Sequence, residues 1–180
     1  MDLEKIKRLV RYIVKGVPNI YKTIDIRQNI TNEELKGKNI LVTGASRGIG
    51  YYIAKLAIKK GAKVLICARK EDTLRKAAEE LGGNCKFLIF DVSDVTGMQS
   101  FLDKSFQLMG GRIDCLVNNA GISFHEGSFR NVIVDGFNAQ FDVNFRGPYF
   151  LAKYYIEKVE ALKQESGNVL FITSERGSFY

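Results

Sequence analysis

The sequence predicts an α/β protein built on a doubly wound parallel sheet. Three observations lead to this fold class. Short apolar segments alternate with segments of helical periodicity from about residue 37, the short segments are almost continuously apolar, and a glycine-rich turn follows the first of them. A continuous apolar run indicates a strand that is covered on both faces, which is typical of a parallel sheet between two helix layers.

Five strands are expected, each a short apolar run. In chain order they cover residues 39–43, 63–68, 87–90, 113–118 and 168–173. The three segments between the first four strands have the spacing of amphipathic helices. Their apolar positions are Ile49, Ile53, Leu56 and Ala57 in the first, Leu74, Ala77, Ala78 and Leu81 in the second, and Val95, Met98, Leu102 and Met109 in the third.

Several residues are expected to mark the ends of helices. Gly82 and Gly83 should end the second helix, since glycine commonly follows a helix C-terminus. Ser93 or Asp94 should cap the third helix. A longer helical stretch, from about residue 135 to 163, should be interrupted near Gly147-Pro148.

Residues 1–36 are expected to form a basic amphipathic extension to a domain that covers residues 37–180. The apolar stripe of this extension consists of Ile6, Leu9, Val10, Ile13, Val14 and Val17. A membrane-surface anchor is one interpretation, because basic amphipathic helices can lie on anionic lipid. Packing on the domain or on a second subunit is the favoured one, because exposed apolar stripes usually find protein partners.

The charge distribution argues against a nucleic-acid partner. The 180 residues carry a net charge of +7, but residues 1–30 hold seven of the 27 basic and three of the 20 acidic residues. The remaining 150 residues therefore carry only +3, without a basic stripe interleaved with aromatics.

The cysteines and the N-terminus predict a cytoplasmic protein without a metal site. Cys67, Cys85 and Cys115 form no close pair of the CxxC kind, so free thiols in a reducing compartment are expected. The N-terminus is too charged for a secretory signal, and no apolar run is long enough to span a bilayer.

The turn between the first strand and the first helix is predicted to bind a pyrophosphate. Helix N-termini offer unpaired N–H groups and a partial positive charge, and glycines allow a sharp turn and a close approach of the phosphate. The candidate cofactor-binding residues within the Thr43–Gly50 turn are Gly44, Ser46, Arg47, Gly48, Ile49 and Gly50.

The end of the second strand favours NADP(H) over NAD(H). An NAD site normally has an acidic residue there for the ribose 2′-hydroxyl. In this chain Ala68 occupies that place and is followed by Arg69 and Lys70. A guanidinium suits a 2′-phosphate, and Arg47 could reach the same group.

Several motifs in order resemble the short-chain dehydrogenase/reductase family, in its Ser-Tyr-Lys branch, over residues 37–180. They are Thr43–Gly50 (the family's TGxxxGIG), Asp91-Val92, Asn118-Asn119-Ala120-Gly121 (NNAG), Asn144, and Ser174 followed by Gly177. The resemblance implies a Rossmann-like fold with five of seven strands present and an oxidoreductase that transfers a hydride between NADP(H) and a carbonyl or alcohol.

The resemblance also implies roles for single residues. Asp91 and Val92 would contact the adenine ring, and Asn118 would buttress the sheet while the NNAG backbone, with Ala120 and Gly121, lines the ribose. The catalytic residues would be Ser174, which holds the substrate oxygen, and Asn144, whose main-chain carbonyl holds a relay water.

The family's Tyr-x-x-x-Lys motif follows the catalytic serine by about a dozen residues, whereas Tyr180 follows Ser174 by six and no lysine comes after it. The 180-residue chain is therefore expected to be an inactive fragment of a parent oxidoreductase that forms a homo-oligomer. The last strand is expected to be a sheet edge, and the long helix is expected to expose an apolar face that helps form a subunit interface in the family.

Two alternatives come from other functional classes. A non-catalytic NADP-binding module would explain the missing tyrosine and lysine, although such a module has no need of Asn144 or Ser174. A methyltransferase would need an acidic residue after the second strand, where Ala68-Arg69 stands. His125 is expected to be a surface residue, and the residues do not identify the substrate.

Overall fold

The computed structural model describes residues 33–124 and 127–173. The expectations for the N-terminal extension, His125, Ser174 and Tyr180 lie outside these residues.

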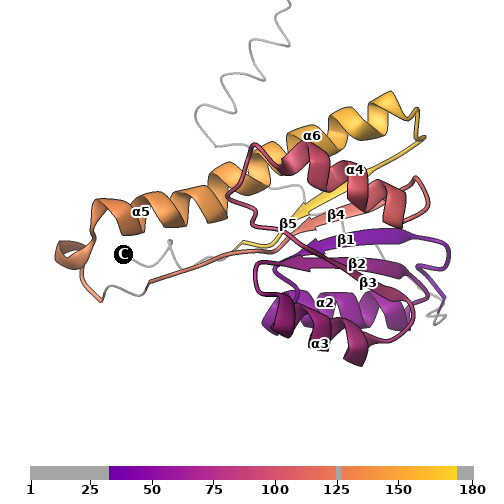
Figure 1. Cartoon of the computed structure of the whole chain (residues 1–180), viewed down its shortest axis with the longest axis horizontal. Coiled ribbons are helices and arrows are strands. Elements are labelled where there is room, and N and C mark those ends of the chain that lie inside the picture. Colours follow the sequence, from indigo (N-terminus) through magenta and orange to yellow (C-terminus); the bar gives the residue numbers. More distant parts are fainter. Residues whose placement is uncertain (1–32, 125–126, 174–180) are drawn as a thin grey trace, which may run out of the picture. The chain divides into compact units, whose positions relative to one another are not determined.

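Within the described residues five parallel strands form one sheet, as predicted. They are β1 (Asn39–Thr43), β2 (Lys63–Ala68), β3 (Cys85–Ile89), β4 (Cys115–Asn118) and β5 (Asn168–Phe171). The strand order is β3-β2-β1-β4-β5, so β1 pairs with β2 on one side and with β4 on the other (Figure 1). The direction of winding reverses between β1 and β4, and ligands of such sheets bind at this switch point, beyond the carboxyl ends of the strands.

Helices cover both faces of the sheet (Figure 1). On one face lie α2 (Gly48–Lys59) and α3 (Glu71–Leu81), and on the other lie α4 (Met98–Leu108) and α6 (Gly147–Ala161). Successive residues of β1 serve both layers: Ile40 and Val42 belong to the core cluster under α2 and α3, and Leu41 to the cluster under α4 and α6. This two-sided burial explains the continuous apolar strands.

The strand ends differ slightly from the predicted ones. The first two strands have the predicted bounds, and β3 begins two residues earlier, at Cys85. Ile113, predicted to begin the fourth strand, precedes β4 because its carbonyl accepts hydrogen bonds from the Tyr155 hydroxyl and the Gln164 side chain instead of from a strand.

The predicted buried face of α2 is wrong at two of its four positions, whereas Ala57 is buried and Ile53 packs against the core. Ile49 and Leu56 are 65% and 57% exposed, and the fully buried residues are Gly50, Ala54 and Ala57. Small residues on this face let the helix lie close against β1 and β2, which is the packing role of the last glycine in dinucleotide-binding turns. Ile49 and Leu56 therefore point away from the sheet.

The end of α3 agrees with the predicted signal, but the predicted side-chain cap of α4 is wrong. Gly82 ends α3 with a positive φ of 84°. The N-cap of α4 is Gly97 and no side chain of the described residues caps the helix; Asp94 Oδ1 accepts the Gly97 N–H at 3.1 Å in the turn before it. Ser93 instead donates to Asp91.

The long helical stretch is interrupted as predicted, by a π-helical turn. A short 3₁₀ turn, η1 (Phe129–Asn131), precedes α5 (Val134–Phe141), which runs through the π-helical turn η2 (Asp142–Arg146) into α6. Pro148 occupies the first turn of α6. Proline is tolerated there because the N–H that it lacks would have no helical partner.

An aromatic row follows this helical stretch. Phe137, Phe141, Phe145 and Tyr149 recur every four residues, with neighbouring ring centroids 5.1 to 6.3 Å apart. All four side chains are exposed in the described part of the chain. This is the apolar face expected from the sequence, and the oligomeric state stays a prediction.

β5 occupies one end of the described sheet, so its outer edge is unpaired there. Leu170 and Phe171 of this strand are about half exposed. This arrangement matches the sheet edge expected from the sequence.

Candidate cofactor-binding site

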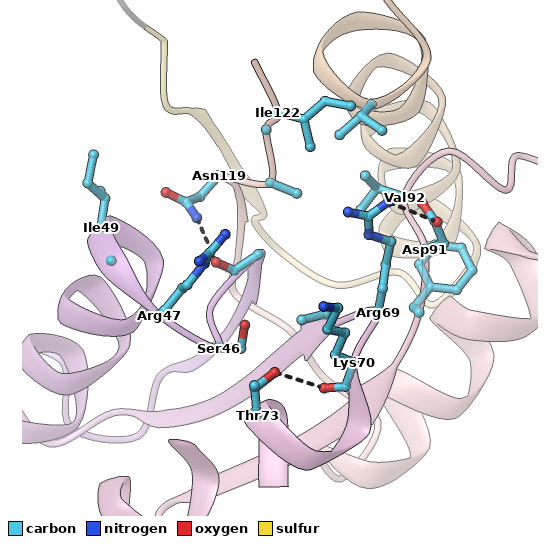
Figure 2. Close-up of a pocket in the computed structure, with 17 residues that line it drawn as sticks. Ser46, Arg47, Ile49, Arg69, Lys70, Thr73, Asp91, Val92, Asn119 and Ile122 are labelled. Carbon is cyan, nitrogen blue, oxygen red and sulfur yellow. Dashed lines mark hydrogen bonds and ion pairs between the residues drawn. The ribbon is translucent and has the colours of Figure 1, made fainter. Parts of the chain in front are cut away.

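A cavity of about 470 Å³ lies beyond the carboxyl ends of β1 to β4 (Figure 2). Four segments far apart in the sequence line it: the turn after β1, the end of β2 with the start of α3, the segment after β3, and the loop after β4. Ten of the predicted cofactor-binding residues line this cavity, namely Gly44, Ser46, Arg47, Gly48, Ile49, Arg69, Asp91, Val92, Ala120 and Gly121.

The turn after β1 has the backbone shape that only glycine adopts easily. Gly44 and Gly48 have positive φ angles of 65° and 59°. A Cβ atom on Gly44 would lie 2.6 Å from the Ala120 Cα, so the turn and the loop after β4 approach each other too closely for any side chain there.

Some backbone N–H groups of this turn donate to protein acceptors, and others have none. The N–H groups of Gly44 and Ala45 donate to the Cys67 carbonyl, at 2.8 and 3.3 Å. Within the described chain, the N–H groups of residues 46–50 have no protein acceptor. Unpaired amides at the start of α2 are the donors that a pyrophosphate needs, so the site fits the group that the sequence predicted.

Thr43 and Asn119 join the turn to the loop after β4. The buried Thr43 hydroxyl oxygen accepts the N–H groups of Asn119 and Ala120, each at 3.0 Å. The Asn119 side chain donates in return to the Thr43 carbonyl at 2.9 Å and to the Gly44 carbonyl at 3.2 Å. Four hydrogen bonds thus hold the two walls of the cavity together.

Two predicted binding residues, Gly50 and Asn118, do not line the cavity. Gly50 is buried, and a Cβ atom there would collide with the Asn119 side chain, so its place is in the packing of α2. The Asn118 amide is buried at the end of β4, and neither its Nδ2 nor its Oδ1 has a partner in the described part of the chain. The bonds that fasten the motif to the turn come from Asn119.

Asn144 lies in the π-helical turn η2, beside the cavity rather than in its lining. Its side chain makes a reciprocal pair of bonds with Ile122: Oδ1 accepts the Ile122 N–H and Nδ2 donates to the Ile122 carbonyl, both at 2.8 Å. This pair ties the helix to the loop after β4. It leaves the main-chain carbonyl of Asn144 as the atom for its predicted catalytic role.

The cavity carries an excess of positive charge. Arg47, Arg69 and Lys70 line it, and Asp91 is the single carboxylate in the lining that the described residues provide (Figure 2). Arg69 Nη1 lies 3.8 Å from Asp91 Oδ2. Within the described ranges, no carboxylate pairs with Arg47 or Lys70, so both cations are available to a phosphate.

Four lining residues were not predicted from the sequence, namely Thr73, Phe90, Ile122 and Val143, and Asn119 was predicted only as part of the NNAG backbone. Thr73 lies in the first turn of α3, one helical turn after Lys70, and its hydroxyl donates to the Lys70 carbonyl at 3.2 Å. That spacing is visible in the sequence, whereas Val143 enters the cavity only through tertiary packing.

All three cysteines are free thiols, as expected; Cys67 is buried, and Cys85 and Cys115 are partly buried. Burial raises the pKa of Cys67 to about 12 and that of Cys85 to about 11, so both thiols stay protonated at neutral pH. In residues 33–124 and 127–173 no group of three metal-ligating side chains comes together. No helix in those ranges has the length and apolarity needed to cross a bilayer.

The winding of the sheet and the amide-lined, cationic cavity define a nucleotide-binding α/β domain. Comparison with known proteins gives the family: the sequence model of the short-chain dehydrogenases matches residues 38–180. The chain belongs to this family of oxidoreductases, as its motifs predicted, and these enzymes act on small molecules.

Curated relatives come from plants, animals and bacteria. The 11-beta-hydroxysteroid dehydrogenase-like 3 of Arabidopsis thaliana is 34% identical over 159 residues, which are 83% of this chain and 48% of the relative. The 3-oxoacyl-[acyl-carrier-protein] reductase FabG of Salmonella typhimurium is 34% identical over 143 residues, which are 79% of this chain and 57% of the relative. The chain thus spans about half the length of the curated relatives it matches.

A solved structure supports the fold. The crystal structure of a metagenomic short-chain oxidoreductase in complex with NADP superimposes with a TM-score of 0.70 at 33% identity. The match covers 79% of this chain and 64% of that one. The Rossmann-like architecture inferred from the sequence is therefore confirmed.

Proposed function

We propose that the domain binds NADP(H), and that the protein to which it belongs transfers a hydride between this cofactor and a carbonyl or alcohol group of a small molecule. The observation that carries the proposal is that turn amides without a protein acceptor and the cations Arg47, Arg69 and Lys70 line the same cavity. A similar protein of known structure is in complex with NADP.

Each wall of the cavity has a part in holding the cofactor. The amides of residues 46–49 donate to the pyrophosphate, and the guanidinium groups of Arg47 and Arg69 bind the 2′-phosphate. Asp91 and Val92 lie at the adenine end, and the loop with Ala120 and Gly121 borders the ribose. The bound nicotinamide supplies the hydride chemistry, and the protein supplies its position.

The catalytic assignments rest on the family motifs. Ser174 would hold the substrate oxygen, and the Asn144 carbonyl would support a proton relay. Reduction of a carbonyl also needs a proton at the substrate oxygen. The six residues after Ser174 contain no Tyr-x-x-x-Lys, so we propose that this 180-residue chain binds cofactor without turning over substrate.

A non-catalytic NADP-binding module is the second candidate. The observation in its favour is that the lining of the cofactor cavity is formed without Asn144, which lies beside it. Any NADPH-dependent reduction of a ketone by a protein carrying this domain would exclude the module.

The free, protonated thiols fit a reducing compartment, and we propose the cytoplasm. Fluorescence microscopy of a tagged form of the protein in the cells that produce it tests this localisation.

Fluorescence titration of the 180-residue chain with NADPH and NADH tests the cofactor assignment. We expect tighter binding of NADPH, and a loss of that preference by roughly tenfold in Arg69→Gln, because a charge-assisted bond to the phosphate contributes about 1.5–3 kcal/mol. Arg130→Gln, an exposed arginine outside the cavity, is the matched control. Equal affinity of the unmodified chain for the two cofactors would refute NADP(H) specificity.

A further inference from the structure

Asp91 is an unexpected neighbour for a phosphate site. It is the lone carboxylate in the cavity lining formed by the described residues, and it stands beside one of the cations proposed to bind the 2′-phosphate. The Asp91 Oδ2 atom lies 3.8 Å from Arg69 Nη1, and Figure 2 shows the two side chains side by side. An anion at this distance competes with a ligand phosphate for the same guanidinium.

Ser93 holds the Asp91 carboxylate in this orientation. Asp91 Oδ1 accepts the Ser93 N–H at 3.0 Å and the Ser93 hydroxyl at 2.7 Å. With Oδ1 engaged twice, Oδ2 is left facing Arg69. The carboxylate is therefore not free to rotate away when a cofactor arrives.

We propose that Asp91, positioned by Ser93, sets the strength of the NADP(H) preference by offsetting part of the Arg69 charge. Asp91 is thereby a specificity-determining residue and Ser93 a positioning residue. This inference rests on the proposed binding of the 2′-phosphate by Arg69. Its physical content is that one guanidinium is shared between a resident carboxylate and the incoming phosphate.

The direction and size of the effect follow from the geometry. Removing the carboxylate returns the full charge of Arg69 to the 2′-phosphate and also removes a repulsion between two anions. The Arg69 and Asp91 side chains are 57% and 39% exposed, so water screens the interaction. Exposed ion pairs have small coupling energies, and we expect a change of roughly two- to fivefold in affinity.

The experiment measures dissociation constants of the 180-residue chain for adenosine 2′,5′-bisphosphate and for 5′-AMP by calorimetry. The ratio of the two constants isolates the 2′-phosphate, because any loss of adenine contact affects both ligands equally. We expect Asp91→Asn to raise the preference for the bisphosphate two- to fivefold. Asp103→Asn, which removes the same charge from the exposed surface of α4, should leave the preference unchanged.

A double-mutant cycle tests whether Arg69 mediates the effect. In an Arg69→Gln background, Asp91→Asn should raise the preference less than it does in the unmodified chain, because only the direct repulsion between the carboxylate and the phosphate is then removed. An equal rise with and without Arg69, or no rise in Asp91→Asn alone, would overturn the proposal.

Ser93→Ala keeps the Asp91 carboxylate but removes the hydroxyl that orients it. This variant therefore tests the proposal even if Asp91→Asn does not fold. Its preference should fall between those of the unmodified chain and Asp91→Asn, and an unchanged value would refute the role of Ser93. Failure of the proposed function can be distinguished from failure of this inference, because the unmodified chain would then bind adenosine 2′,5′-bisphosphate and 5′-AMP with equal affinity.

Discussion

Thr43→Val tests whether one buried hydroxyl joins the two walls of the cofactor cavity. Valine has nearly the shape of threonine, so the packing of β1 is preserved while the oxygen is lost. That oxygen accepts the N–H groups of Asn119 and Ala120 at 3.0 Å each. Each buried donor left without a partner costs about 1–3 kcal/mol. Because both donors are only partly buried, we take the lower part of that range and expect a total loss of about 2–3 kcal/mol.

Urea unfolding followed by circular dichroism measures this loss. Thr43→Ser is the matched control, because it keeps the acceptor and removes only a methyl group, at a cost of about 1 kcal/mol. We also expect Thr43→Val, more than Thr43→Ser, to weaken NADPH binding, since the loop after β4 forms part of the cavity. If both variants unfold at the same urea concentration, the two hydrogen bonds contribute little and the reasoning is wrong.

Three further predictions concern the turn, the amino end of the sheet and the core. Gly44→Ala should weaken NADPH binding by at least about tenfold in the same titration, because a Cβ atom would meet Ala120 and the positive φ adds about 1–2 kcal/mol of strain; unchanged affinity would contradict the close approach. Burial opposes ionisation of Asp114, but the Asn39 N–H and the Arg112 guanidinium outweigh it and hold the pKa of that carboxyl below its usual range. The stability from this lowered pKa is therefore present above about pH 4 and lost as the pH falls through the folded-state value; acid unfolding should be less steep in Asp114→Asn, and parallel curves would refute the assignment. Tyr155→Phe should lower the free energy of unfolding by about 1 kcal/mol, because the hydroxyl donates to a buried carbonyl at 2.9 Å; a thermal melt identical to that of the unmodified chain would count against it.

Local patterns in the sequence predicted those parts of the fold that depend on neighbouring residues. The bounds of β1 and β2 follow from apolar runs, and the shape of the turn follows from Gly44 and Gly48. The place of Arg69 in the cavity follows from its position after the second strand. In each case the signal lies within a few residues of the feature.

The features that the sequence did not predict depend on contacts between distant segments. Asn119 bonds to Thr43 across 76 residues, and Asn144 bonds to Ile122 across 22. Periodicity also placed Ile49 and Leu56 of α2 wrongly on its buried side, because close packing on the sheet selected small residues over large ones. The distance between helix and sheet is a property of the assembled fold, and no single-chain pattern records it.

The π-helical turn between α5 and α6 has a consequence for the aromatic row. In an α-helix of 3.6 residues per turn, side chains four apart advance slowly around the axis. A π-helical turn takes more residues, so it reverses that advance and keeps Phe137, Phe141, Phe145 and Tyr149 in line across the joint. The number of residues in the segment 142–146 therefore determines how far α6 is rotated about the helix axis relative to α5. Deleting one residue there would rotate α6 and misalign the rings, although every aromatic side chain would remain.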